Sequence, residues 1–240
     1  MTAASIAMVP THVTQMRRGT RAATQRKLDA LLAAAAALIA ERGFEATSMR
    51  DLSRAMGVSL AGLYHYAESK EELLYKIQFR TFASLLSTQQ EVAELPGTPE
   101  ERLRRLVVGH LAFFTSHPNE LKVCTYELES LRGKRYRSTE ELRRRYYRLM
   151  ARVLADLMGE PAGPHAESRA SRHTALYIFG MLNWIFMWYG ASKHGSIDKI
   201  GEEMLDLVLN GVRRKKATRR ARPRTAPKGR ASKRGASKRE

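Results

Sequence analysis

The sequence has almost no cysteine, since Cys124 is the one cysteine among its 240 residues. This excludes an internal disulfide and a four-cysteine zinc site, and it favours a reducing cytoplasm. Long apolar runs are also missing, because the most apolar window, residues 177–191, is 15 residues long and contains Asn183. A bilayer span takes about 20 predominantly apolar residues. Residues 1–16 have no basic residue ahead of an apolar run, so a secretory signal peptide is not expected.

Acidic residues are missing from both ends of the chain. Residues 1–28 hold five basic residues and no acid, and residues 213–240 hold fourteen basic residues and one acid, Glu240. The net charge of +18 therefore lies at the ends, because residues 29–212 carry 23 bases and 23 acids. A neutral body with two cationic ends favours a polyanionic partner, either nucleic acid or an anionic membrane.

Apolar residues recur with the period of a helix along almost the whole chain, and no segment shows sustained strand alternation. We therefore expect an all-α fold. Residues 1–23 are expected to form a disordered basic arm, residues 24–70 a helical head and residues 71–212 a larger helical domain. Residues 213–240 lack apolar periodicity, which predicts a disordered basic tail that attracts DNA without choosing its sequence.

Two short helices in the head are separated by the turn Gly57-Val58-Ser59. Ser48, with an acid three residues later, forms a capping box that starts the first of them, and Ser59 caps the second, residues 60–66. Gly57 permits the tight turn between them. This arrangement is a helix-turn-helix pattern, in which the second short helix is held rigidly with one face free for the major groove of DNA.

These residues resemble the TetR family of bacterial transcriptional regulators over about residues 24–75. The residues that carry the resemblance are Gly43-Phe44, Thr47 to Leu52, Ala55 to Ser59, Gly62 to Tyr66 and Ser69 to Leu74. Ala67 departs from the family, which usually has an aromatic or branched residue there, and this predicts looser packing of the third helix on the fourth. The resemblance implies a cytoplasmic, nucleoid-associated homodimer that binds a palindromic operator in double-stranded DNA and responds to a small-molecule effector.

The residues expected to contact DNA gather around the helix-turn-helix. Thr47 and Ser48 lie at a helix N-terminus, where free N–H groups favour a phosphate, and Arg50 can reach a phosphate or a base edge. The resemblance adds the start of the third helix as the part that faces the bases, and Tyr64, His65 and Lys70 as phosphate contacts. The complete set is Arg17, Arg18, Arg21, Thr47, Ser48, Arg50, Ser59, Leu60, Ala61, Gly62, Tyr64, His65 and Lys70.

Each of these assignments has a plainer alternative. Arg50 and Lys70 can be solvated surface charges, and Tyr64 can belong to the core. Ser59 is the one polar side chain at the start of the third helix, so contacts with thymine methyl groups and DNA shape have to contribute to sequence recognition.

An aromatic-rich helix is expected near residues 166–189, followed by a final helix near 196–212. In TetR-like regulators the penultimate helix meets its twin in the dimer on one face and lines an effector pocket on the other. The resemblance therefore implies a dimer interface made by Tyr177, Phe186, Ile200, Met204 and Leu207. Both tryptophans lie on the aromatic-rich helix, four residues apart, so we expect them to share a face. The alternative is that all these aromatic residues are simply core.

A pocket for the effector is expected between aromatic and adaptable apolar walls. Its predicted lining is Phe113, Phe114, Tyr126, Tyr147, Met150, Leu154, Trp184 and Trp188. The stretches from Glu127 to Tyr147 and from Asn183 to Tyr189 resemble acyl-CoA-responsive TetR members that govern fatty-acid or sterol degradation. That resemblance implies an acyl-CoA-like effector, whose phosphates the run Arg143–Arg145 could hold; the alternative is that this run is a solvated helix face.

No catalytic pattern accompanies these features. The sequence has no zinc-type His/Cys spacing, no glycine-rich phosphate loop and no arrangement of nucleophile and base. We therefore expect no metal, no cofactor and no enzyme activity. The leading hypothesis is a ligand-released repressor. An architectural, largely non-specific DNA-binding protein that uses its basic ends is the alternative, and an enzyme acting on an acyl-CoA is the third.

Overall fold

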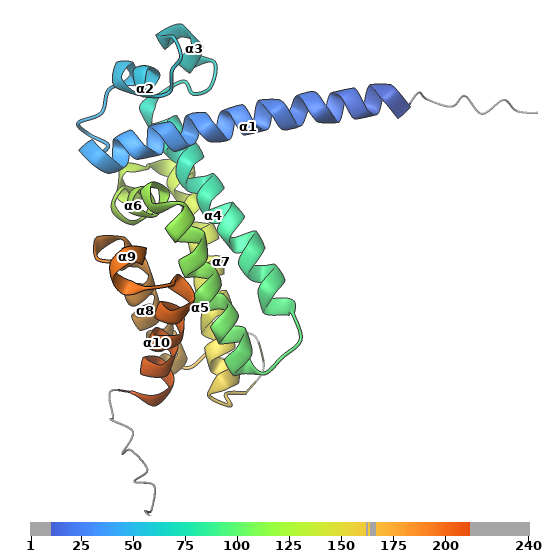
Figure 1. The fold of residues 1–240 in the computed structure, drawn as a ribbon, viewed down its shortest axis with the longest axis vertical. Helices are drawn as coiled ribbons and strands as arrows, with labels where there is room; N and C mark the ends of the chain where they lie inside the picture. Colours follow the sequence, from blue (N-terminus) through green and yellow to red (C-terminus); the bar gives the residue numbers. More distant parts are fainter. Residues whose placement is uncertain (1–10, 162, 164–166, 212–240) are drawn as a thin grey trace, which may run out of the picture.

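The structure is a computed structural model that describes residues 11–161, 163 and 167–211; for residues 11–24 it describes the backbone alone. All regular elements of these ranges are helical, which confirms the predicted all-α fold (Figure 1). Within the same ranges, no helix is long and apolar enough to cross a bilayer. The predicted basic tail, residues 213–240, lies outside the described residues.

The head consists of α1 (Thr11–Arg42), α2 (Met49–Ala55), α3 (Leu60–Tyr64) and the first part of α4 (Lys70–Glu94). The first helix begins at Thr11, before the predicted start at residue 24, so residues 11–23 are helical where an irregular arm was expected. Pro10 precedes the helix, and the residues that follow are mostly tolerated in helices, with Gly19 as the one strong breaker.

The predicted caps are confirmed at both short helices. The Ser48 side chain accepts a hydrogen bond from the Asp51 N–H at 3.2 Å, while the Asp51 carboxylate accepts one from the Ser48 N–H at 3.1 Å. Ser59 accepts from the Gly62 N–H at 3.0 Å and starts α3. Gly57, with a φ of 64°, makes the turn between α2 and α3 in a backbone region that favours glycine.

The head has its own apolar core. Leu52 of α2 and Leu63 of α3 are fully buried, and Phe44 folds back from the end of α1 into the same cluster. Met56, the C-cap residue of α2, is buried in the same cluster, whereas Ala55 is exposed. Ala67 is buried as well, so its small side chain lies inside the head core.

The second domain is a bundle of longer helices. It contains α5 (Pro99–Ser116), α6 (Pro118–Tyr126), α7 (Gly133–Leu157), α8 (Arg169–Asn183) and α10 (Ile197–Asn210). Two 3-10 helices, η1 (Leu128–Ser130) and η2 (Ile185–Met187), and the short helix α9 (Ala191–His194) lie in the connections between them. Figure 1 shows α4 running from the head down along this bundle.

The two cores share elements. Leu73, Leu74 and Ile77 of α4 belong to the head core, whereas Leu85 and Leu86 of the same helix belong to the bundle core. Residues of the second domain also close the head core from below, and these are Val123 of α6, Leu128 of η1 and Leu131. The head therefore packs on the bundle through a continuous apolar contact.

The aromatic-rich helix is shorter than predicted. α8 ends at Asn183 with Trp184 as its C-cap, and the chain continues as the 3-10 turn η2. The expectation that Trp184 and Trp188 share one helix face is therefore wrong. The run of aromatic and β-branched residues after Asn183 has low helix propensity, and Gly190 follows shortly after it.

Candidate DNA-binding face and effector region

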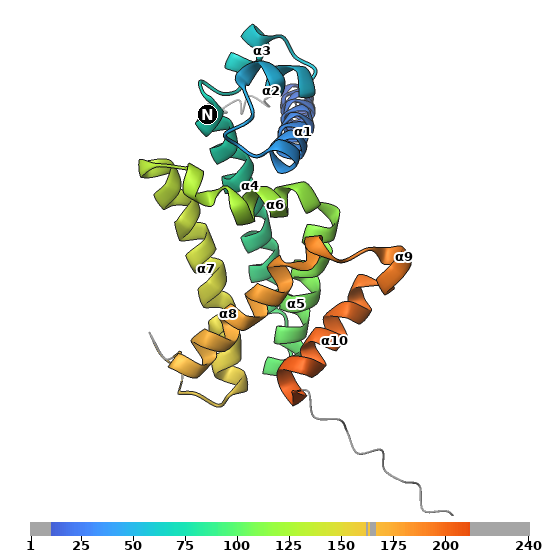
Figure 2. The same cartoon turned by 90° about the vertical axis from the view of Figure 1, so that its left-hand side faces the viewer.

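The outer side of α3 faces solvent at the end of the molecule remote from the bundle (Figure 2). Ala61, Tyr64 and His65 are exposed, and 51 % of the Tyr64 surface is accessible. Leu63 anchors the opposite side in the head core. Leu60 and Gly62 are half-buried, and Ser59 is exposed although its oxygen caps the helix. A short rigid helix with one open face meets the geometric requirement for entry into a major groove.

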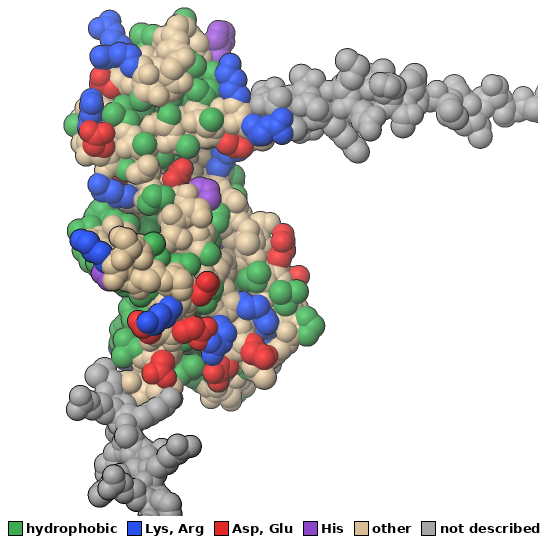
Figure 3. All heavy atoms as spheres, in the orientation of Figure 1, with side chains coloured by type: hydrophobic (Ala, Val, Ile, Leu, Met, Phe, Trp, Pro, Cys, Tyr) green, Lys and Arg blue, Asp and Glu red, His purple; other side chains and the backbone are tan. Residues whose placement is uncertain are grey.

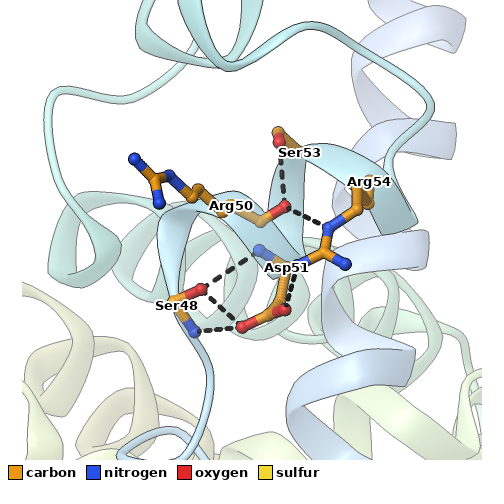
Figure 4. Close-up of polar contacts among 5 residues, drawn as sticks. All are labelled: Ser48, Arg50, Asp51, Ser53 and Arg54. Carbon is orange, nitrogen blue, oxygen red and sulfur yellow. Dashed lines mark hydrogen bonds and ion pairs between the residues drawn. The ribbon is translucent and has the colours of Figure 1, made fainter.

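Two arginines on α2 differ in their electrostatic environment (Figure 4). The Arg54 guanidinium donates to the Asp51 carboxylate at 2.8 Å. Hydrogen bonds from Ser48 hold the pKa of Asp51 below its usual value, and the charge of Arg54 adds to this effect. The Arg50 side chain points away from this group, and it has no ion-pair partner among the residues that the structure describes. Arg50 is thus the uncompensated cation of this helix.

Thr47 does not lie where a phosphate contact requires it. Its side chain is buried, and its hydroxyl donates to the Gly43 carbonyl oxygen at 2.7 Å. The prediction that Thr47 contacts DNA is therefore wrong for its side chain, because the residue closes the turn after α1. Ser48 is exposed and forms the capping box described above.

The predicted phosphate contact of Lys70 stays a prediction, and in the structure its ammonium group already has partners within the head. Its ammonium group donates to the carbonyl oxygen of Phe44 at 2.9 Å and lies 4.3 Å from the centre of the Phe44 ring. The Lys70 side chain is 20 % exposed, so the ammonium is committed to this loop. Contact with a phosphate would compete with the hydrogen bond to Phe44.

Glu127, a residue of the second domain, binds the backbone N–H of Phe44, whose carbonyl oxygen accepts from Lys70. The Phe44 N–H donates to Oε1 of Glu127 at 3.0 Å, and Oε2 of Glu127 accepts from the Ser130 hydroxyl at 3.0 Å. Glu127 was not among the predicted site residues. Its partner lies 83 residues earlier in the chain, so no local pattern could reveal the contact.

The remaining predicted DNA contacts precede the head. Arg17, Arg18 and Arg21 lie on the N-terminal half of α1, and their side chains are outside the described part of the chain. Their predicted contact with DNA stays a prediction.

The predicted pocket residues lie in three different surroundings. Phe114, Met150 and Leu154 are buried in the bundle core, and Phe113 faces a different cavity, beneath α1. Tyr147 is half-buried, and its hydroxyl donates to the Arg172 carbonyl oxygen at 3.2 Å. The other three, Tyr126, Trp184 and Trp188, are exposed on the outside of the domain. The tryptophans lie there because α8 stops before them.

Exposed apolar side chains lie on α8, η2 and α10 and at the ends of these elements. Tyr177, 68 % exposed, is the most accessible of them. We call this surface the α8–α10 apolar face, and its residues are Leu176, Tyr177, Trp184, Met187, Trp188 and Leu207. These elements lie on the side of the molecule turned to the viewer in Figure 2.

The predicted dimer residues fall partly on this face. Tyr177 and Leu207 belong to it, and Met204 is half-buried. The Phe186 ring lies between those of Tyr126 and Trp184, with centroid distances of 5.8 Å and 5.9 Å. Ile200 is buried against the bundle core, so its assignment to an exposed interface is wrong; it lies on the inner stripe of α10.

Buried polar side chains inside the bundle were not predicted. Within the described residues, Gln78, Gln89, His110 and Thr139 have buried polar atoms with no hydrogen-bond partner. Gln78 and Gln89 occupy the same helical stripe as buried Leu85, and this polar interruption of an apolar stripe is the signal that could have found them. Such atoms are available to a polar group that enters the bundle.

His110 is the titratable member of this set. Its Nδ1 lies 3.1 Å from the hydroxyl of Tyr146, and its ring packs against Phe114 and Phe179. Burial lowers the pKa of His110 to about 3 and raises that of Tyr146. Both groups are therefore neutral near pH 7. No group of three or more potential metal ligands is present in the described ranges.

Comparison with known proteins matches both halves of the chain to models of one family. The model described as bacterial regulatory proteins, tetR family, matches residues 31–77, and the model described as tetracyclin repressor-like, C-terminal domain, matches residues 96–212. Among curated proteins, the chain is 23 % identical to the HTH-type transcriptional repressor KstR2 of Mycobacterium tuberculosis, over 76 % of this chain and 90 % of that protein.

Two solved structures share the fold. A TetR-family transcriptional regulator from Bordetella parapertussis is 27 % identical with a TM-score of 0.71, over 77 % of this chain and 95 % of that one. AibR, solved in complex with isovaleryl coenzyme A and operator DNA, is 25 % identical with a TM-score of 0.63, over 75 % of this chain and 97 % of that one.

The buried imidazole predicts a pH dependence of stability. The unfolded chain binds a proton at His110 near pH 6.5, whereas the folded chain does so near pH 3. The contribution of neutral His110 is therefore complete above about pH 6.5 and is lost as the pH falls toward 3. Between pH 7 and pH 5 we expect the free energy of unfolding in urea to fall by about 2 kcal/mol more than in His110→Leu. Equal slopes in both proteins would contradict this prediction.

Proposed function

Because the chain belongs to the TetR family of bacterial transcriptional regulators, we propose that it is a homodimeric repressor that a small effector releases from its operator. The observation that carries the proposal is the open face of α3 beside the uncompensated Arg50, on a head packed against an effector-type C-terminal domain. Both matching family models describe regulatory proteins, in keeping with the expectation that the chain is not an enzyme.

DNA recognition in this proposal combines α3 with the cations around it. Ser59, Leu60, Ala61 and Gly62 face the base edges, and Ser48, Tyr64 and His65 contact phosphates together with Arg50. Direct hydrogen-bond readout by this short helix is sparse, so the shape of the operator contributes to specificity. The basic segments at residues 1–28 and 213–240 add salt-sensitive attraction and keep the protein near the nucleoid.

Pairing of two chains through the α8–α10 apolar face sets the distance between the two heads. A surface that groups Tyr177 and both tryptophans is unusual for an isolated soluble domain and fits a self-complementary interface. One helix-turn-helix alone makes too few contacts for useful specificity, whereas a two-fold pair reads two half-sites about one helical turn apart.

The effector in this proposal is an apolar or acyl-CoA-like molecule that enters the bundle. AibR was solved with isovaleryl coenzyme A, and curated relatives include KstR2 and a fatty acid metabolism regulator protein of Bacillus subtilis. In this chain, the unpartnered polar atoms of Gln89 and His110 would form hydrogen bonds with such a ligand. The effector releases DNA only if it binds better to the arrangement that does not fit the operator.

A gel-shift experiment with the DNA flanking the gene of this protein tests the proposal. The full chain and a chain lacking residues 213–240 should both prefer that DNA over random sequence at moderate salt, with lower affinity for the shorter chain. Loss of all binding with the tail would favour the architectural alternative instead.

The identity of the effector is tested by titrating the complex of the full chain and its DNA with acyl-CoA thioesters of increasing chain length. Release of the DNA by at least one thioester, and no release by free coenzyme A, is expected. If no thioester releases the DNA, the acyl-CoA part of the proposal fails while the DNA-binding part stands.

Arg50 and Arg54 form a matched pair for mutation. Arg50→Ala should weaken operator binding and lower the slope of log affinity against log salt by about one unit. Arg54→Ala should have a smaller effect, because Asp51 already compensates that charge. Fluorescence anisotropy over a salt series measures both variants. A larger loss in Arg54→Ala than in Arg50→Ala would contradict the assignment.

Tyr177→Arg tests the dimer. Two-fold pairing would bring both introduced charges into the interface, so sedimentation velocity should show the mass of one chain, where the unchanged protein shows that of two. Leu95→Arg, at another exposed apolar residue outside this face, is the control and should remain dimeric. A monomeric unchanged protein, or a dimeric Tyr177→Arg variant, would refute this interface.

A further inference from the structure

A cavity of about 500 Å³ lies where α1 of the head crosses α4, the end of α5 and the start of α6. Its volume falls in the range that holds a small organic ligand. It belongs neither to the α3 face nor to the α8–α10 apolar face, and it is separate from the polar atoms buried inside the bundle. Figure 3 shows acidic and histidine side chains at this junction, below α1.

The charges around the cavity leave one carboxylate without a counter-ion. Arg80 of α4 forms an ion pair with Asp29 of α1 across the cavity, so these two charges compensate each other. Glu120 of α6 has no hydrogen bond or ion pair with any described residue. Glu120 lies in the first turn of α6. An anionic ligand would meet Glu120 and would have to break the Arg80–Asp29 pair, whereas a cation would find a free partner.

Two aromatic side chains, Phe113 and His117, line one side of the cavity. The rings of Phe113 and His117 are stacked, with centroids 4.7 Å apart and an angle of 21° between their planes. The Nδ1 of His117 lies 2.8 Å from the Phe113 carbonyl oxygen, which can only accept, so Nδ1 carries the proton. Across the cavity, Ala30 and Ala33 of α1 leave room for a ring.

We propose that this cavity binds a planar aromatic monocation, with its ring against Phe113 and His117 and its cationic nitrogen beside Glu120. A ligand of this class matches both the aromatic rings in the lining and the carboxylate that has no counter-ion. Because it would touch α1 and the bundle at once, its binding would fix the angle of the head on the second domain. The site goes beyond the acyl-CoA effector, and its occupation requires neither an operator nor a dimer.

Binding of thioflavin T, a planar cation that fluoresces when immobilised, to the full chain without DNA tests the proposal. Saturable binding is expected, and Glu120→Gln should weaken it about fivefold. Glu94→Gln is the matched control, since Glu94 lines a separate cavity of about 390 Å³, and it should leave the affinity unchanged. The uncharged benzothiazole analogue that lacks the N-methyl group should bind more weakly to the unchanged protein than thioflavin T.

A second variant fills the space without touching the core. Ala33 is exposed on α1 and lines the cavity, so Ala33→Phe should abolish dye binding while thermal unfolding by circular dichroism stays near that of the unchanged protein. Absence of saturable binding, equal affinity in Glu120→Gln, equal affinity of the uncharged analogue, or binding retained in Ala33→Phe would each overturn the proposal. None of these outcomes bears on DNA binding, so the proposed function would be judged separately.

Discussion

The peptide group of Phe44 is held by both halves of the molecule. Lys70 at the start of α4 donates to its carbonyl oxygen, and Glu127 beside η1 accepts from its N–H. These are charge-assisted hydrogen bonds in a partly buried place, where they are stronger than their neutral counterparts. They fix the end of α1, and thereby the platform on which α2 and α3 stand. The position of α3 relative to the bundle therefore depends on the two hydrogen bonds of the Phe44 peptide group.

Local sequence patterns were sufficient to predict most of the helices of the fold. Ser48, Ser59 and Ser69 each start a helix, because a serine cap is a contact within three residues and can be read from the sequence. Gly57 likewise predicted the turn between α2 and α3, because the preference of glycine for positive φ is a local property. The end of the aromatic-rich helix was missed, because apolar spacing continues through Trp184 and Trp188 while the backbone leaves the helix.

Roles that depend on distant partners could not be predicted. Lys70 was assigned to a phosphate because resemblance gave its position along the chain, whereas its ammonium group lies on a loop 26 residues earlier. Ile200 and Leu207 are both apolar residues of α10, and only the packing shows that one faces the core and the other solvent. His110 lies beside Tyr146, which is 36 residues away along the chain. Long-range packing, rather than composition, decides these roles.

The sharing of α4 and α6 between the two cores limits how this regulator can be recombined with its relatives. A graft cut at residue 70 would separate Leu73, Leu74 and Ile77 from the head they complete, and it would remove the floor provided by Leu128 and Leu131. A chimera with a foreign sensing module would therefore expose apolar surface unless the donor supplied matching side chains at that seam. The exchangeable unit is the head together with its contacts to α4, α6 and η1. We therefore expect the second domain of this chain to change by substitution within the bundle rather than by exchange of whole domains.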